Sequence, residues 1–194
     1  MHCVQTAACM PPKHSIGAPR LIRNCFFSSS FPVAMHDALR QHIRKSLTGD
    51  FPAHASFQDA VADWPHDQRG VRPEGVPYSG WELVEHIRLA QADLLRYSQN
   101  DDYAPDTWPD AYWPDTPNPP SRNAWHTSCE TVVADRETLL ALLDESNPFE
   151  PVPSHDTHTL LRSALIVLDH NAYHTGQLVT VRRLLGCWPP ADTA

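Results

Sequence analysis

The chain has 194 residues, of which 41% are hydrophobic and six are tryptophan, so it is long enough for one domain with a sizeable core. Its formal charge of −8 at pH 7 argues against nucleic-acid binding, which favours basic surfaces. No run of about 18 apolar residues is present, which excludes a membrane-spanning helix.

Residues 1–34 are basic, contain three consecutive serines and show neither helical periodicity nor strand alternation. Three interpretations stay open: a start assigned upstream of the true one at Met35, a transit-like peptide, or a disordered tail. The first is favoured, because Met35 begins a clean helical segment. We expect this extension to be disordered and without a role in chemistry, followed by one domain over residues 35–188 and a tail over residues 189–194.

The first predicted helix runs from Met35 to about Leu47, and a second helical segment runs from about Ala53 to Trp64. Gly49 and Pro52 lie between the two segments, so they form either one kinked helix or two separate helices. A loop rich in glycine and proline follows and ends this part of the chain.

The next predicted helix begins at Ser79 and ends at about Gln99. Ser79 and Glu82 have the spacing of a capping box, which is typical of a helix start. One histidine interrupts the apolar row that this helix directs to the core, whose members are Leu83, His86 or Ile87, Ala90, Leu94 and Tyr97. A single histidine on such a face is more often a hydrogen-bonded core residue than a metal ligand, so His86 needs other ligands near it.

Residues 101–120 contain six prolines together with Trp108, Tyr112 and Trp113. The prolines exclude a helix or a central strand, and the aromatic residues argue against simple disorder. Two interpretations stay open for this long loop: a lid or pocket wall, or a segment that only covers the end of the bundle.

A further helix is predicted from Ser121 to about Glu145, and a polar link over residues 149–159 follows it. The link contains His155, Asp156 and His158, which could line the mouth of a site or lie in solvent. We favour solvent for all three.

The last predicted helix, Leu160 to Leu185, has apolar residues at intervals of three and four for most of its length. Thr157 or Thr159 can cap its start, and Gly186 stands where a left-handed residue commonly ends a helix. No convincing strand pattern occurs anywhere in the sequence. The predicted fold is therefore all-α: a four-helix bundle with a long loop, rich in proline and aromatic residues, between the second and third main helices.

His170 and His174 lie four residues apart in this last helix, so both imidazoles project from one face about one turn apart. This is the spacing by which one helix gives two nitrogen ligands to a metal ion. The alternative is a pair of histidines that hydrogen-bond within the bundle or at its edge. With His86 as third ligand, the pair would form a three-histidine site with at least one coordination position open for water or substrate.

Other metal sites fit the sequence less well. A di-iron bundle needs a glutamate three residues before each histidine, and these positions hold Leu83 and Val167. Asn171 follows His170, which excludes the zinc-protease motif HExxH. Only Cys129 and Cys187 belong to the predicted domain and they have no paired spacing, which suggests neither a closed structural zinc site nor a disulfide framework and fits a reducing cytoplasm.

Two segments that carry these histidines resemble a known family. They are Trp81–Ile87, with the sequence WELVEHI, and Asp169–Leu178, with the sequence DHNAYHTGQL. The end of the last helix, Arg182–Gly186, follows the same pattern, and the loop motifs Asp102-Tyr103 and WPDAYWP support it. On these segments the chain resembles the DinB superfamily of metalloenzymes, which includes the YfiT-like proteins.

The resemblance covers about Met35 to Trp188, and residues 1–34 match nothing in it. It implies a four-helix bundle, commonly dimeric, with a divalent metal ion (zinc, nickel, iron or manganese) bound by one histidine of the second helix and two of the fourth. Those roles fall on His86, His170 and His174. The activities of the family vary, so the resemblance implies the metal but not the reaction.

Two functions are expected from this set of residues. The first is a cytoplasmic, homodimeric enzyme whose metal activates water or a small thiol, giving a hydrolase or a thiol S-transferase that acts on a small molecule. Glu85, Asp169 or His155 would accept a proton, and Arg88, Arg96 or Arg162 could bind an anionic thiol cofactor. The second is a non-catalytic stress-response bundle that binds metal or a small molecule. The expected acceptors for the outer ring nitrogens are Glu82, one turn before His86, and either Asp169 or Gln177 near the other two histidines.

Overall fold

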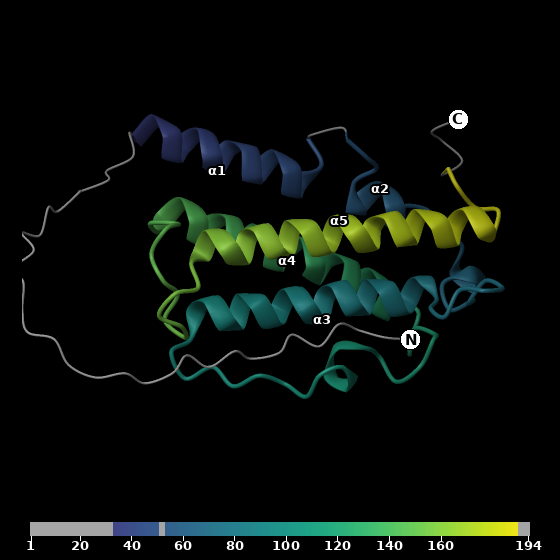
Figure 1. Ribbon diagram of the computed structural model, residues 1–194. Helices are drawn as coiled ribbons and strands as arrows, with labels where there is room; N and C mark the ends of the chain where they lie inside the picture. The colour runs from purple at the N-terminus through teal and green to yellow at the C-terminus, as the bar shows by residue number, and fades with distance from the viewer. Residues whose placement is uncertain (1–32, 51–52, 190–194) are drawn as a thin grey trace, which may run out of the picture. The chain divides into compact units, whose positions relative to one another are not determined.

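The computed structural model describes residues 33–50 and 53–189, with the side chains of residues 33 and 34 excepted. Most of the expected N-terminal extension and nearly all of the expected tail therefore lie outside the described residues. The described part contains five α-helices and no strand, as Figure 1 shows. The helices are α1 (Val33–Thr48), α2 (Phe57–Val61), α3 (Gly80–Gln99), α4 (Ala124–Glu145) and α5 (Leu160–Leu184).

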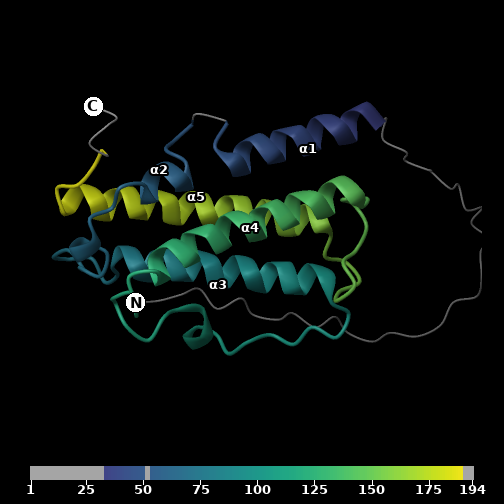
Figure 2. The same ribbon diagram turned by 180° about the vertical axis from the view of Figure 1, so that it is seen from behind.

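The bundle is built around α3, which packs against both α4 and α5, while α1 lies against α4 and α5. Figure 1 shows α3 and α5 side by side, and the reverse view in Figure 2 shows α4 in front of them. The predicted all-α helical bundle is thus confirmed. No helix in the described part of the chain combines the length and the apolarity needed to cross a lipid bilayer.

Two apolar clusters hold the helices together. The cluster near α1 consists of Ile43, Leu47, Leu139, Leu140, Leu143, Val152, Leu160, Ala164 and Val167. The second cluster is rich in tryptophan and consists of Phe57, Ala60, Trp64, Trp81, Leu83, Val84, Ile87, Trp125, Val132, Leu178 and Val181. The second cluster joins the turns of α3 and α5 around His86 and His174 to residues of α2 and α4, so it fixes the spacing of α3 and α5 at that level.

The helix boundaries follow the capping signals of the sequence. Ser79 caps α3, and its side chain and that of Glu82 form the expected capping box. At the start of α5 the cap is Thr159, whose side chain accepts the N–H of Arg162 at 3.2 Å. Gly186 follows α5 with a φ of +73°, the left-handed conformation that glycine adopts without strain.

The second helical segment is shorter than the sequence predicted. Instead of running from Ala53 to Trp64, the helix covers only Phe57–Val61. The guanidinium of Arg182 donates hydrogen bonds to the carbonyl oxygens of Asp59, Ala60 and Ala62, at 3.4, 3.1 and 2.7 Å. These are acceptors that a longer helix would use for its own N–H groups, so a side chain from α5 ends α2.

Residues 101–120 form an extended loop interrupted by a single 3₁₀ turn, Asp110–Tyr112. Both ribbon views show this loop running along the outer side of α3 (Figures 1 and 2), and the turn contacts α3 directly. The loop therefore covers the side of the bundle, and not only its end.

One expectation for the polar link before α5 was wrong. His155 and Asp156 are exposed as predicted, but the side chain of His158 is buried. Its Nε2 lies 2.9 Å from the hydroxyl of Ser163, which in turn accepts a hydrogen bond from the hydroxyl of Ser98 at 2.8 Å. His158 is buried because this hydroxyl pair offers a polar partner within the helix–helix contact.

Candidate metal centre

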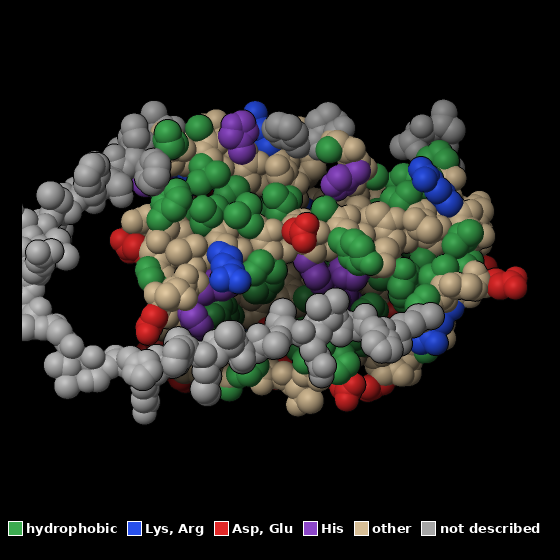
Figure 3. All heavy atoms as spheres, viewed as in Figure 1, with side chains coloured by type: hydrophobic (Ala, Val, Ile, Leu, Met, Phe, Trp, Pro, Cys, Tyr) green, Lys and Arg blue, Asp and Glu red, His purple; other side chains and the backbone are tan. Residues whose placement is uncertain are grey.

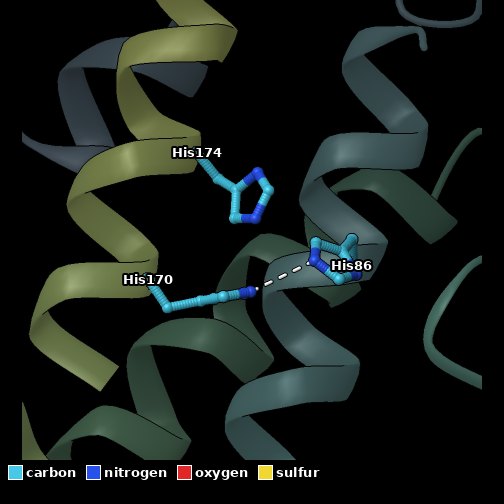
Figure 4. Close-up of side chains that lie close together, drawn as sticks. All are labelled: His86, His170 and His174. Carbon is cyan, nitrogen blue, oxygen red and sulfur yellow. Dashed lines mark hydrogen bonds between the residues drawn. The ribbon is translucent and has the colours of Figure 1, made fainter. Parts of the chain in front are cut away.

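The three histidines singled out in the sequence meet between α3 and α5. His86 lies in the second turn of α3, and His170 and His174 project from successive turns of α5 toward it (Figure 4). One ring nitrogen from each histidine lies within 4.8 Å of the other two. The closest approach is between Nε2 of His86 and Nε2 of His170, at 3.1 Å.

The outer nitrogens of two of these rings face oxygen acceptors. Nδ1 of His86 lies 2.8 Å from the backbone carbonyl oxygen of Tyr112, and Nδ1 of His174 lies 2.6 Å from Oε1 of Gln177. Carbonyl and amide oxygens only accept hydrogen bonds, so Nδ1 carries the proton in both rings. In a neutral imidazole this leaves Nε2 with a free lone pair, which is the form that binds a metal ion.

The third ring has the other tautomer. Because Nε2 of His86 has no proton, Nε2 of His170 carries one and donates it to the lone pair of His86 at 3.1 Å. His170 would bind a metal ion through this nitrogen once its proton has moved to Nδ1. Figure 4 shows that the inner nitrogen of His174 also faces this pair. The inner nitrogens of all three rings are therefore directed at one small volume.

Burial keeps all three imidazoles neutral. It lowers the pKa of His86, of His170 and of His174, and for His174 the pKa falls to about 4. The neighbouring imidazoles lower the pKa of His170 and His174 further, because two like charges so close together repel each other. Metal ions bind neutral histidine, so the cluster has the required protonation state at neutral pH.

Aromatic rings cover two sides of the cluster. Trp113 of the loop stacks on His86 with 4.0 Å between ring centroids and 5° between ring planes. Tyr173 meets His174 edge-on at 4.9 Å, and its side chain is 64% exposed. Figure 3 shows histidine atoms at the surface between α5 and α3, although His86 and His174 themselves are only 4% and 8% exposed.

An amide ladder fixes the backbone beside His170. The Asn171 side chain donates to Oε1 of Gln91 at 2.7 Å, and the Gln91 side chain donates to the carbonyl oxygen of Val132 at 2.7 Å. These hydrogen bonds link α5, α3 and α4 near the three clustered histidines. Neither amide was singled out in the sequence, although Asn171 is adjacent to a candidate ligand and Gln91 interrupts an apolar helix face.

The three expected proton acceptors lie in different surroundings. Glu85 is buried and forms an ion pair with Arg88 at 2.7 Å. Asp169 is exposed and precedes His170 directly. His155 lies with its ring 6.4 Å from that of Tyr97, three turns further along α3 than His86.

Of the expected acceptors for the outer ring nitrogens, only Gln177 makes such a contact within the described part of the chain. Glu82 instead binds the side chain of Arg72 and the backbone N–H of Ser79. The acceptor of His86 is the carbonyl of Tyr112, which the sequence could not reveal because every residue has a backbone carbonyl. The aromatic residues of the loop were the only sequence feature that indicated a role for this segment as a pocket wall.

The geometry fits a metal ion bound by three nitrogens. Two nitrogen ligands at about 2.0–2.1 Å from a tetrahedral ion lie about 3.4 Å apart. The His86–His170 pair is already at 3.1 Å, and a spread of no more than 4.8 Å requires only a small approach of the third ring. Since no other cluster of three potential ligands occurs among the described residues, this is the candidate metal centre.

Comparison with known proteins agrees with this assignment. A family model described as the DinB superfamily matches residues 53–178, which is more than half of the chain and includes all three histidines. No curated protein and no solved structure gives a match.

Proposed function

Because the chain belongs to the DinB superfamily, we propose that it is a metal-dependent enzyme in which His86, His170 and His174 bind one divalent metal ion. The observation that carries the proposal is the direction of the ring nitrogens. Two outer nitrogens donate to oxygen acceptors, and the inner nitrogens of three neutral rings converge within 4.8 Å. Zinc, nickel, iron and manganese all accept imidazole ligands, so the donor set is compatible with each of them.

A divalent ion held by three imidazoles would supply Lewis acidity, which can lower the pKa of a water molecule to about 7 or stabilise a thiolate. The chain's own residues would provide the surroundings. Trp113 and Tyr173 form apolar walls that limit the entry of bulk water, and Gln177 holds the ring of His174 in place. Asp169, exposed and next to a ligand, is the better-placed proton acceptor, because Glu85 is engaged by Arg88.

The metal content of tag-free protein tests the proposal. Elemental analysis should find close to one equivalent of a divalent metal, and His170→Ala should lose most of it. His155→Ala is the matched control, because His155 is an exposed histidine outside the cluster and its loss should leave the metal content unchanged. A wild-type protein that binds no added divalent metal would refute the proposal.

The reaction type needs a second experiment. We propose either hydrolysis or the transfer of a small thiol to an electrophile, and the metal-loaded protein should turn over one of two substrate sets: esters and amides, or thiols with electrophiles. For the thiol reaction, two of the three arginines expected to bind an anionic cofactor are already paired, Arg88 with Glu85 and Arg96 with Asp93 and Asp106.

One observation favours a non-catalytic metal-binding protein instead. Trp113 stacks flat on His86 and so closes one approach to the ligands. If neither substrate set reacts while the metal binds in one equivalent, binding without catalysis is the better description.

A further inference from the structure

The ligand His86 is connected to a polar cluster two turns further along α3, formed by Asp93, Arg96, Tyr103 and Tyr112. Asp93 is 9% exposed and accepts hydrogen bonds from the hydroxyl of Tyr112 at 2.7 Å and from the hydroxyl of Tyr103 at 3.0 Å. Arg96 donates to the same carboxylate at 2.9 Å. The carboxylate therefore fixes two points of the loop to α3.

Tyr112 has two separate bonds to α3. Its hydroxyl donates to Asp93, and its backbone carbonyl accepts the Nδ1 proton of His86 at 2.8 Å. His86 and Asp93 are seven positions apart in α3, which is about 10 Å along the helix axis. The long tyrosine side chain spans the helix surface between them. The next residue, Trp113, stacks on His86.

This arrangement has a chemical consequence. The proton of a neutral imidazole goes to the nitrogen that faces the better acceptor, so the position of the Tyr112 carbonyl decides which nitrogen of His86 is protonated. A displaced carbonyl would free His86 to place its proton on Nε2, and that nitrogen could then no longer bind a metal ion.

We propose that Asp93 is a positioning residue for the metal centre: through the hydroxyl of Tyr112 it holds the loop carbonyl that keeps Nε2 of His86 free. Asp93 itself lies two turns from the ligand and does not contact the metal position. The strong hydrogen bond is consistent with the raised pKa of Tyr112, which burial and the neighbouring carboxylate both cause. The inference rests on the proposed metal function and adds a residue that positions one of its ligands, His86.

Tyr112→Phe tests the proposal with little disturbance, since it removes one hydroxyl and keeps the ring and the backbone. Tyr103→Phe is the matched control, because it removes an equivalent bond to Asp93 but its carbonyl does not face His86. Circular dichroism and thermal unfolding establish that each variant is folded. Asp93→Asn should act in the same direction as Tyr112→Phe, and the double variant should lose less than the sum of the two single losses, because both changes weaken the bond between Tyr112 and Asp93.

Two readouts are needed. In metal-free protein labelled with ¹⁵N, the ring nitrogen chemical shifts of His86 should show the proton on Nδ1 in the wild type and in Tyr103→Phe. In Tyr112→Phe they should show that part of the population carries the proton on Nε2. In a chelator competition, Tyr112→Phe should bind Zn²⁺ roughly 10- to 100-fold more weakly, the usual cost of losing a partner behind a metal ligand.

The two proposals can fail separately. If the wild type binds no metal, the proposed function fails, and the nitrogen shifts of the metal-free protein still decide the role of Asp93. If Tyr112→Phe keeps both the wild-type tautomer and the wild-type Zn²⁺ affinity, or if Tyr103→Phe changes them as much, the positioning role is refuted while the metal function stands.

Discussion

The indole of Trp113 lies parallel to the imidazole of His86, with 4.0 Å between the ring centroids and 5° between the planes. These two residues belong to different parts of the chain, a proline-rich loop and a bundle helix. Their contact makes the loop a wall of the candidate metal centre, so changes in the loop should alter the binding of a metal ion there.

Trp113→Ala should release metal faster. An aromatic stack of this kind contributes about 0.5–1.5 kcal/mol, so its loss should speed metal release to a chelator by up to about tenfold. The rate is measured by mixing metal-loaded protein with excess chelator. Trp108→Ala is the control, because Trp108 belongs to the same loop but its side chain is 68% exposed. An equal acceleration in both variants would argue against a specific role for the stack.

Gln177 should matter for metal affinity and not only for stability. Its Oε1 accepts the Nδ1 proton of His174 at 2.6 Å, so Gln177→Leu removes the group that orients this ligand. We expect the affinity for Zn²⁺ to fall roughly 10- to 100-fold in a competition titration. Gln177→Glu keeps an acceptor and should retain most of the affinity; a loss as large as that of the leucine variant would contradict the proposed orientation.

Gly80→Ala should destabilise the fold. A Cβ at position 80 would meet the ring of Trp64 at 2.5 Å, and Trp64 is almost fully buried against Trp125. Overpacking of this kind costs about 1–3 kcal/mol in the free energy of unfolding, measured by urea denaturation. Gly176→Ala is the matched control: nothing lies within 4 Å of its added Cβ, and alanine in a helix interior should gain up to about 1 kcal/mol.

Arg182 should contribute far more to stability than its neighbour Arg183. The guanidinium of Arg182 is buried, binds three carbonyl oxygens at the end of α2 and lies over the rings of Trp64 and Trp188. Arg182→Met leaves those acceptors unpaired, so we expect a loss of about 3 kcal/mol or more. Arg183→Met removes an exposed charge from the same turn and should stay within about 0.5 kcal/mol of the wild type. Equal losses in urea denaturation would contradict this assignment.

The stability of the protein should fall in mild acid partly because of His158. Burial lowers the pKa of His158 below its ordinary value of 6.5, and the charges of Arg162 and His155 lower it further. Below pH 6.5 the unfolded chain therefore binds a proton that the folded chain resists, so the contribution of His158 is complete above that pH and is lost as the pH falls through the folded pKa.

The variant His158→Gln isolates this contribution. Its free energy of unfolding should decline less steeply than that of the wild type between pH 7 and about pH 5, measured by urea denaturation of metal-free protein, since only the slope due to one histidine is removed. The histidines of the metal centre titrate in both proteins and cancel in the difference. Parallel curves would show that His158 does not resist protonation.

The helical bundle and the histidine pair of α5 could be predicted from the sequence alone, whereas His86 was a candidate third ligand that the resemblance to a family joined to that pair. For the bundle and the pair, local rules were sufficient: the apolar rows predicted the helices, Ser79 and Gly186 predicted helix ends, and the spacing of His170 and His174 placed both rings on one face. These signals depend on residues within a few positions of one another, so no tertiary information is required to read them.

The surroundings of these features could not be predicted in the same way, because they depend on how distant segments pack. Three features depend on contacts between residues far apart in the chain. They are the packing of the loop on His86, the burial of His158, and the end of α2, where Arg182 binds the last carbonyl oxygens. Two of these contacts use backbone carbonyls, which every residue carries and no sequence pattern marks. Which carbonyl meets which donor is set by how the helices pack, and that packing exists only once the whole core has formed.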